Sequence, residues 1–220
     1  MNFKNGFPKL YILILPLLGM GLFLVLYVIA AINYPGGSRI DTNQIGFSFY
    51  NNYLCDLLDD FAINGELNIA RFFARAALGL LCASLMLLWY HLPKLFSVTS
   101  INRTIMRLSG LVSLFITLFL ASGTHDLILR IAGVFGIIAV FTASIELYKS
   151  QLYKLMFFGI LCLCIFFANY YIYETGIYIE LLPLIQKITF IAFIIWFATL
   201  GSSLYKNLKW DYISSAKRII

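Results

Sequence analysis

The chain has 220 residues, of which 61% are hydrophobic and only 12% carry a charge. Soluble globular proteins average about 25% charged residues, so this composition excludes a soluble globular protein. The net charge of +6 comes from basic residues spread over several short segments, without the basic stripe of a nucleic-acid-binding surface. We therefore expect no nucleic-acid partner. Six apolar runs can each cross a ~30 Å hydrocarbon core, and they predict an all-α, polytopic membrane helix bundle that forms a single domain.

In chain order, the six predicted transmembrane helices cover about residues 10–32, 67–92, 104–122, 127–147, 155–173 and 181–204. The first follows Lys4 and Lys9 and ends at the turn residues 34–37. Its apolar run is longer than the roughly 7–15 residues of a signal-peptide core, so we interpret it as a span. Only one connection is long, the segment 33–66 after the first helix.

Charged residues alternate between the two sides of the predicted membrane. Eleven of the sixteen Lys and Arg lie in the two terminal segments and in the connections after the second and fourth helices, whereas eight of the ten Asp and Glu lie in the other connections. The positive-inside rule then places both termini in the cytoplasm, with the protein in the plasma (inner) membrane. Five basic residues remain on the acidic, outer side: Arg39, Arg71, Arg75, Arg130 and Lys187.

The long connection carries a group of polar residues at helical spacing. Asn52, Asp56, Asp59 and Asp60 are spaced i, i+4, i+7 and i+8, so a helix would place them on one face. This spacing predicts that the segment 33–66 contains an interfacial helix, which lies on the outer leaflet. The alternative interpretation is a solvated acidic face without a binding role.

Basic residues within the spans are a second candidate. Arg71 and Arg75 share a face of the second helix, and Lys187 lies in the sixth because the apolar run after it has only 13 residues. A charge at the bilayer centre costs roughly 2.5–3.5 kcal/mol, so such residues indicate a site unless they reach the interface by snorkelling. Asp126, Glu174 or an acidic residue of the first connection are the predicted partners of Lys187.

The turn between the third and fourth helices is a third candidate. Asp126 and Arg130 can pair at i, i+4, and Asp126 also suits the positive N-terminal end of a helix. His125 is the only histidine on the outer side and can act as a proton carrier or ligand. All these candidates together predict a polar cluster under the first connection: Arg71, Arg75, Asp126, Arg130, Lys187, His125, Asp56 and Asp60.

Three short motifs carry a resemblance to a known family: Tyr34-Pro35-Gly36-Gly37, Asn52-Tyr53-Leu54-Cys55-Asp56-Leu57 and Gly123-Thr124-His125-Asp126. Over most of its length the chain resembles an uncharacterised family of prokaryotic six-helix integral membrane proteins. That family more often has Ser-Asp-Leu before the second helix, and here Cys55 stands in place of the serine. The family has no settled activity, so the resemblance implies the fold and adds nothing about chemistry.

We expect a protein that binds a lipid head group, a small anion or a membrane-protein partner, with Arg71, Arg75, Arg130 and Lys187 as anion contacts. One alternative is a small transporter or channel with a proton relay through Lys187 and Asp126, although no inverted repeat supports it. Another is an intramembrane lipid hydrolase or transferase, with Cys55 as nucleophile, His125 as base and Arg75 as oxyanion partner. The two histidines lie on opposite sides, so we expect no metal and no other cofactor.

Overall fold

The structure, a computed structural model, describes residues 10–121 and 125–217. Lys4, Lys9, Gly123 and Thr124, named above, lie outside the described residues, as does Arg218, one of the basic residues counted in the C-terminal segment. Within the described residues, six helices are long and apolar enough to cross a membrane, which confirms the predicted polytopic helix bundle. The helices are α1 (Leu15–Ile32), α2 (Ala70–His91), α3 (Ile101–Thr117), α4 (His125–Lys149), α5 (Tyr153–Thr175) and α6 (Leu182–Lys217). Short 3-10 helices precede α1 (Leu10–Leu13) and α6 (Ile179–Leu181) and follow α2 (Leu92–Leu95) and α3 (Leu118–Ala121).

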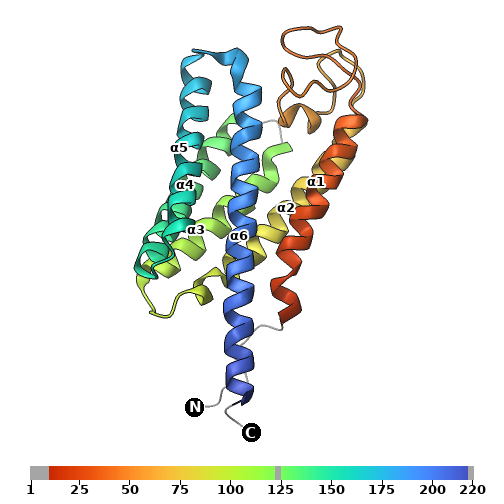
Figure 1. Cartoon of the computed structure of the whole chain (residues 1–220). Coiled ribbons are helices and arrows are strands. Elements are labelled where there is room, and N and C mark those ends of the chain that lie inside the picture. Colours follow the sequence, from red (N-terminus) through yellow and green to blue (C-terminus); the bar gives the residue numbers. More distant parts are fainter. Residues whose placement is uncertain (1–9, 122–124, 218–220) are drawn as a thin grey trace.

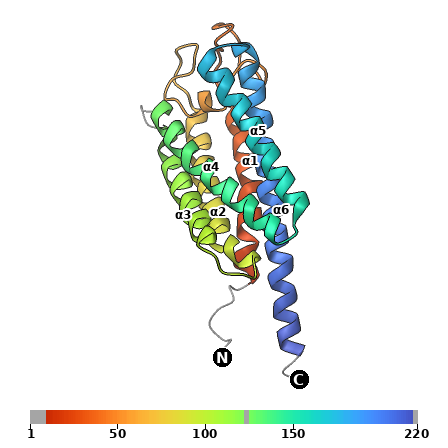
Figure 2. The same ribbon diagram turned by 90° about the vertical axis from the view of Figure 1, so that its left-hand side faces the viewer.

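Each helix packs against the next one in the chain, and α6 also packs against α1, which closes the bundle (Figure 1). The connection between α1 and α2 lies at one end of the bundle, and we call this the loop end. The beginning of α1 and the end of α6 lie at the opposite end, which we call the terminal end (Figure 2).

Local sequence signals explain several helix boundaries. Pro16 lies in the first turn of α1, where a missing backbone N–H removes no helical hydrogen bond. Ser100 caps α3 by accepting a hydrogen bond from the Arg103 backbone N–H at 3.3 Å. Gly176 ends α5 in the left-handed conformation, with φ +70°, which favours glycine.

The end of α6 differs most from its predicted boundary. The prediction placed it near residue 204, but the helix continues to Lys217 and extends beyond the other helices at the terminal end (Figure 2). Hydropathy marks where a span leaves the hydrocarbon core, whereas a helix continues until a residue interrupts it. The segment 205–217 contains neither glycine nor proline, so nothing in the sequence ends the helix there.

The terminal half of the bundle is densely packed. Its largest fully buried side chains come from α2, α3, α4 and α6: Leu88, Met106, Leu147, Trp196 and Leu200. The indole N–H of Trp196 donates a hydrogen bond to the Leu155 carbonyl of α5 at 2.9 Å, so even this buried polar atom is satisfied.

The connection between α1 and α2 does not contain the interfacial helix that the spacing of Asn52, Asp56, Asp59 and Asp60 suggested. Its helical part is limited to the 3-10 turn Cys55–Leu57, and the rest consists of turns and two isolated β-bridges. Asn52 and Asp56 bind backbone N–H groups of this connection, those of Ser48 and Tyr53, at 2.9 and 2.8 Å. Such local side-chain bonds compete with helix formation, which explains the difference.

Candidate functional site

Five polar side chains of the membrane helices share one role, because they bind the main chain of the segment Asn52–Asp60. We call this segment the roof segment. Four donate a hydrogen bond to one of its carbonyl groups and one accepts from one of its N–H groups: Tyr27, Arg71, Arg75, Lys187 and Gln186. The polar groups of α1, α2 and α6 therefore hold the roof segment over the end of the bundle.

Lys187 makes the most buried of these contacts, with only 2% of its surface exposed. Its Nζ donates to the carbonyl oxygen of Asn52 at 2.5 Å and to that of Pro183 at 3.0 Å. The rings of Phe47 and Phe49 lie 5.5 and 5.2 Å from the same nitrogen, within cation–π range. Among the described residues, this ammonium forms no ion pair with Asp126 or Glu174, because carbonyl oxygens and aromatic faces surround it. Of the predicted acidic partners, Asp56 of the first connection attracts it electrostatically.

Leu54 is held from two helices at once. Its N–H donates to Oε1 of Gln186 in α6 at 2.9 Å, and its carbonyl accepts from the Tyr27 hydroxyl of α1 at 2.8 Å. Neither Gln186 nor Tyr27 was predicted as a site residue. Gln186 is a polar residue within an apolar run, but its partner is a backbone group, which has no sequence signature.

Arg71 and Arg75 hold the other end of the roof segment. Arg75 donates from Nε to the Leu58 carbonyl at 2.9 Å and from Nη2 to the Asp60 carboxylate at 2.9 Å. Arg71 donates to the Asp60 carbonyl at 2.7 Å, with its Nε 3.6 Å from the same carboxylate. The predicted proximity of Arg71, Arg75 and Asp60 is therefore present, and it fastens the connection to α2.

Within the connection, three buried polar side chains fix the path of the chain. Asn52 donates to the Gly37 carbonyl at 2.8 Å and to Asp56 at 3.1 Å, and Asn68 donates to three carbonyls of the roof segment. Burial raises the pKa of the Asp56 carboxyl above its usual value, and its hydrogen bonds from Asn52 and Tyr53 oppose part of this shift. Asp56 is thus part of the internal structure of the connection.

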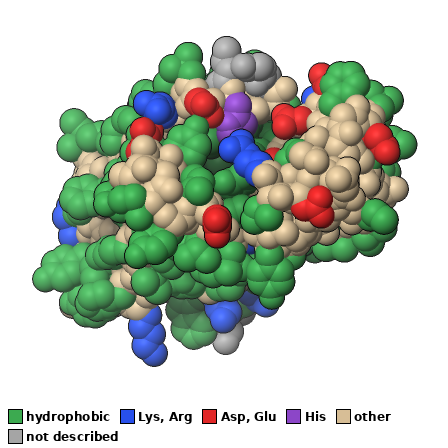
Figure 3. Space-filling view, turned by 90° about the horizontal axis from the view of Figure 1, so that it is seen from above, with side chains coloured by type: hydrophobic (Ala, Val, Ile, Leu, Met, Phe, Trp, Pro, Cys, Tyr) green, Lys and Arg blue, Asp and Glu red, His purple; other side chains and the backbone are tan. Residues whose placement is uncertain are grey.

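The remaining predicted residues form a separate group at the loop end of α4. Nδ1 of His125 lies 3.3 Å from Asp126, whereas Arg130 pairs with Glu174 of α5 at 2.8 Å instead of with Asp126. His125 also interacts electrostatically with Asp59 of the roof segment. The predicted residues therefore fall into distinct groups instead of one cluster, and charged side chains of both signs are spread over this face (Figure 3).

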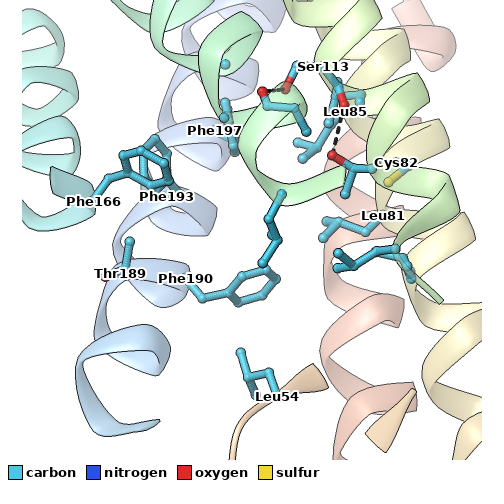
Figure 4. Close-up of a pocket in the computed structure, with 18 of the residues that line it drawn as sticks. Leu54, Leu81, Cys82, Leu85, Ser113, Phe166, Thr189, Phe190, Phe193 and Phe197 are labelled. Carbon is cyan, nitrogen blue, oxygen red and sulfur yellow. Dashed lines mark hydrogen bonds between the residues drawn. The ribbon is translucent and has the colours of Figure 1, made fainter. Parts of the chain in front are cut away.

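Beneath the roof segment lies a cavity of about 390 Å³ that is bordered by the bundle helices, is partly open and has a mostly apolar lining. Leu81 and Leu85 of α2 line one side, and Phe166, Phe190 and Phe193 of α5 and α6 line the other (Figure 4). At the loop end the cavity is bounded by the roof segment and His125, and it extends inward as far as Trp89. Sequence analysis did not predict this cavity, because apolar residues that line a hollow and those that fill a core have the same pattern.

A few polar side chains interrupt the apolar lining. Ser113 and Thr117 of α3 bind carbonyl oxygens of Ala132 and Ser113 at 2.8 Å each, and Asn169 of α5 donates to Thr189 of α6 at 3.3 Å. These residues were missed by the sequence analysis. The available signal was a polar side chain inside an apolar run, and only charged residues were predicted on that basis.

The predicted nucleophile Cys55 also borders the cavity, but its environment does not favour thiolate formation. Burial, with a smaller contribution from the nearby Asp56 carboxylate, raises the pKa of the Cys55 thiol to about 12. Reactive cysteines have a lowered pKa, so this thiol is poorly suited to the proposed hydrolase or transferase chemistry. In residues 10–121 and 125–217, no three His, Cys, Asp or Glu side chains come together as a metal site would require.

Comparison of the chain with protein-family models, with curated proteins and with solved structures finds no match. The resemblance to a family of six-helix membrane proteins therefore stays a prediction.

Proposed function

We propose that this protein binds a membrane amphiphile, whose hydrocarbon chain occupies the cavity beneath the roof segment. The cavity itself is the observation that carries the proposal. Its volume of about 390 Å³ falls within the roughly 300–1,000 Å³ typical of ligand sites, which are mostly apolar with a few polar groups. A lipid chain matches the apolar part, and the polar residues near the loop end suit a head group.

The free energy of an empty cavity supports an occupant. Apolar voids destabilise proteins by on the order of 24 cal/mol per Å³. This cavity is partly open, so only its enclosed part carries such a cost, and an apolar occupant would remove it. Water fills cavities that offer several polar partners, and this lining offers few, so hydrocarbon is the more favourable occupant.

The contacts of the basic residues argue against the small anion that the sequence suggested. Lys187 is bound to carbonyl oxygens, Arg71 and Arg75 are bound to Asp60 and backbone carbonyls, and Arg130 is paired with Glu174. A phosphate or carboxylate would have to displace these partners. The proposal therefore keeps a lipid as the ligand and assigns its recognition to the apolar cavity.

We further propose that the protein lies in the plasma (inner) membrane, with the loop end facing outward and both termini in the cytoplasm. The distribution of the charged residues along the chain supports this orientation. In this orientation, the cavity opens to lipid or solute from the outer half of the bilayer.

A variant that fills the cavity tests the proposal. Gly133 lines the cavity, and a Cβ atom there would meet only Phe166, at 3.5 Å, so there is room for a larger side chain. We expect Gly133→Leu to lower two quantities, each by at least fivefold. These are the amount of co-purified lipid in native mass spectrometry and the affinity for a fluorescent C18 acyl probe. Gly79→Leu is the matched control, because Gly79 has open space around it and does not line the cavity. Equal lipid content in wild type and both variants would refute the proposal.

A further inference from the structure

Two hydrogen-bonding side chains inside the cavity bear on the head group of the ligand. Nδ2 of Asn169 donates to Oγ1 of Thr189 at 3.3 Å, and the Thr189 hydroxyl donates to the Ile185 carbonyl at 2.7 Å. Among the described residues, no hydrogen bond reaches Oδ1 of Asn169. The Oδ1 atom of Asn169 can therefore accept a hydrogen bond from a ligand, and the second N–H of the same amide can donate one.

The position of this pair places it within the membrane. Asn169 lies six residues before the end of α5, and Thr189 lies seven residues after the beginning of α6, which corresponds to about 9 and 10 Å along each helix. Both residues line the cavity, and Thr189 is buried. Polar side chains at such depth are unfavourable in lipid and usually serve a ligand or a partner helix.

The charges around the loop end of the cavity disfavour an anionic head group. Each basic side chain of the outer side has a partner within the protein: Arg39 lies 5.0 Å from the ring of Tyr53, and the other four are bound to carboxylates or carbonyls. Carboxylates of Asp59 and Asp126 flank His125, which borders the cavity. A phosphate here would approach the carboxylates of Asp59 and Asp126 and would compete with Asp60 and Glu174 for Arg75 and Arg130.

We propose that the bound amphiphile carries an uncharged, hydroxyl-bearing head group, and that Asn169 and Thr189 hold it by hydrogen bonds. This inference rests on the proposed function and names its ligand class: a monoacylglycerol or a long-chain alcohol, in preference to an anionic phospholipid. A hydroxyl group both donates and accepts, so it matches the open Oδ1 atom and the second amide N–H of Asn169.

The test compares two probes that share one acyl chain and differ only in the head group, oleoylglycerol and oleoyl lysophosphatidate. Binding to the purified full-length protein is measured by competition with the fluorescent C18 acyl probe. We expect oleoylglycerol to bind at least tenfold more tightly than the lysophosphatidate. Asn169→Leu and Thr189→Val should each weaken oleoylglycerol three- to tenfold and weaken the lysophosphatidate, which has one hydroxyl fewer, by less.

Thr199→Val is the matched control, because Thr199 also lies in α6 and binds a backbone carbonyl but does not line the cavity. Thermal unfolding midpoints of all variants establish that they are folded. If either Asn169→Leu or Thr189→Val does not fold, the other still provides the test. Equal affinity for the two probes, tighter binding of lysophosphatidate, or equal losses for both probes in Asn169→Leu would overturn the head-group inference alone. If neither probe binds wild type better than Gly133→Leu, the proposed function itself fails.

Discussion

At the residue scale, Lys187 shows how a membrane helix can carry a charge without an acidic partner. Burying an ammonium group is unfavourable unless hydrogen bonds or other charges compensate. Here two carbonyl oxygens and two aromatic faces surround it, and Asp56 attracts it from a greater distance. The charge thus stabilises the position of the roof segment at a point where a neutral side chain would make a weaker contact.

Replacement of Lys187 tests this role. In Lys187→Met the carbonyl of the buried Asn52 loses its donor, which should lower the free energy of unfolding by about 1–3 kcal/mol. Thermal unfolding measures this loss, and hydrogen exchange should become faster at the amides of the roof segment. Lys154→Met is the control, since Lys154 is exposed. An unchanged exchange rate in the roof segment would contradict the assigned contact.

The raised pKa of Cys55 predicts an unusual pH dependence of alkylation. With a pKa of about 12, the thiolate fraction at pH 8 is on the order of a thousandfold below that of a free cysteine with pKa ~8.5. Only the thiolate reacts, so in a variant with Cys82, Cys162 and Cys164 replaced by alanine, the maleimide rate should rise about tenfold per pH unit up to pH 10.

A cysteine-free variant with Glu66→Cys provides the comparison for Cys55, because Glu66 is an exposed position of the same connection. Its rate should level off near pH 8.5. If restricted access alone slowed the alkylation of Cys55, the rate would still level off near pH 8.5. Such levelling would therefore count against the raised pKa.

At the element scale, α5 and α6 approach closely where Gly159 faces Trp196. A Cβ atom at Gly159 would lie 2.8 Å from Cζ2 of the indole, which is fully buried and bound to the Leu155 carbonyl. The absence of a side chain at residue 159 thus allows the two helices to pack in the terminal half.

We therefore expect Gly159→Ala to destabilise the protein by about 1–3 kcal/mol, because the rigid indole has little room to move. Gly21→Ala serves as the control, since a Cβ there meets nothing within 4 Å, and alanine favours a helix by up to about 1 kcal/mol. Thermal unfolding of both variants in the same detergent separates the two effects. Equal stability of the two variants would show that the α5–α6 contact is looser than described.

The sequence predicts the spans well and predicts the connection and the cavity poorly, because these features depend on different properties of the chain. The six spans were predictable because a membrane-crossing helix must be apolar over a fixed length, and the charged residues within spans correctly indicated where polar contacts occur. The partners of Arg75 and Lys187 were not predictable in full, because most of them are backbone carbonyls. The fold of the connection depends on contacts of Asn52 and Asn68 with distant backbone groups, and the cavity depends on how all helices pack together.

At the scale of the whole molecule, the bundle has two unlike halves. The terminal half is filled by large side chains such as Trp196 and Leu88, whereas the loop half surrounds the cavity and is covered by the roof segment. If the loop end faces outward, as proposed, the hollow half lies in the outer leaflet. A bound amphiphile would then come from the outer leaflet or from the external solution.

Site-specific labelling tests this orientation. In a cysteine-free variant, we expect a membrane-impermeant maleimide to label Glu66→Cys in intact cells and to label Ser97→Cys only after the membrane is permeabilised. Both positions are exposed, and they lie in connections at opposite ends of the bundle. Labelling of Ser97→Cys in intact cells, with protection of Glu66→Cys, would reverse the assigned orientation.

The way in which the roof segment is fastened has a consequence for how its sequence can vary. Lys187, Arg71, Arg75 and Tyr27 bind main-chain carbonyl groups, which every residue type supplies. Gln186 binds a main-chain N–H group, which every residue type except proline supplies. Many side chains of the roof segment can therefore change without loss of these bonds, whereas a change at any of the five helix positions removes one. In a distant relative with the same fastening, we therefore expect a tyrosine in the first span, two arginines four residues apart in the second and a Gln-Lys pair in the sixth, even where its roof segment has a different sequence.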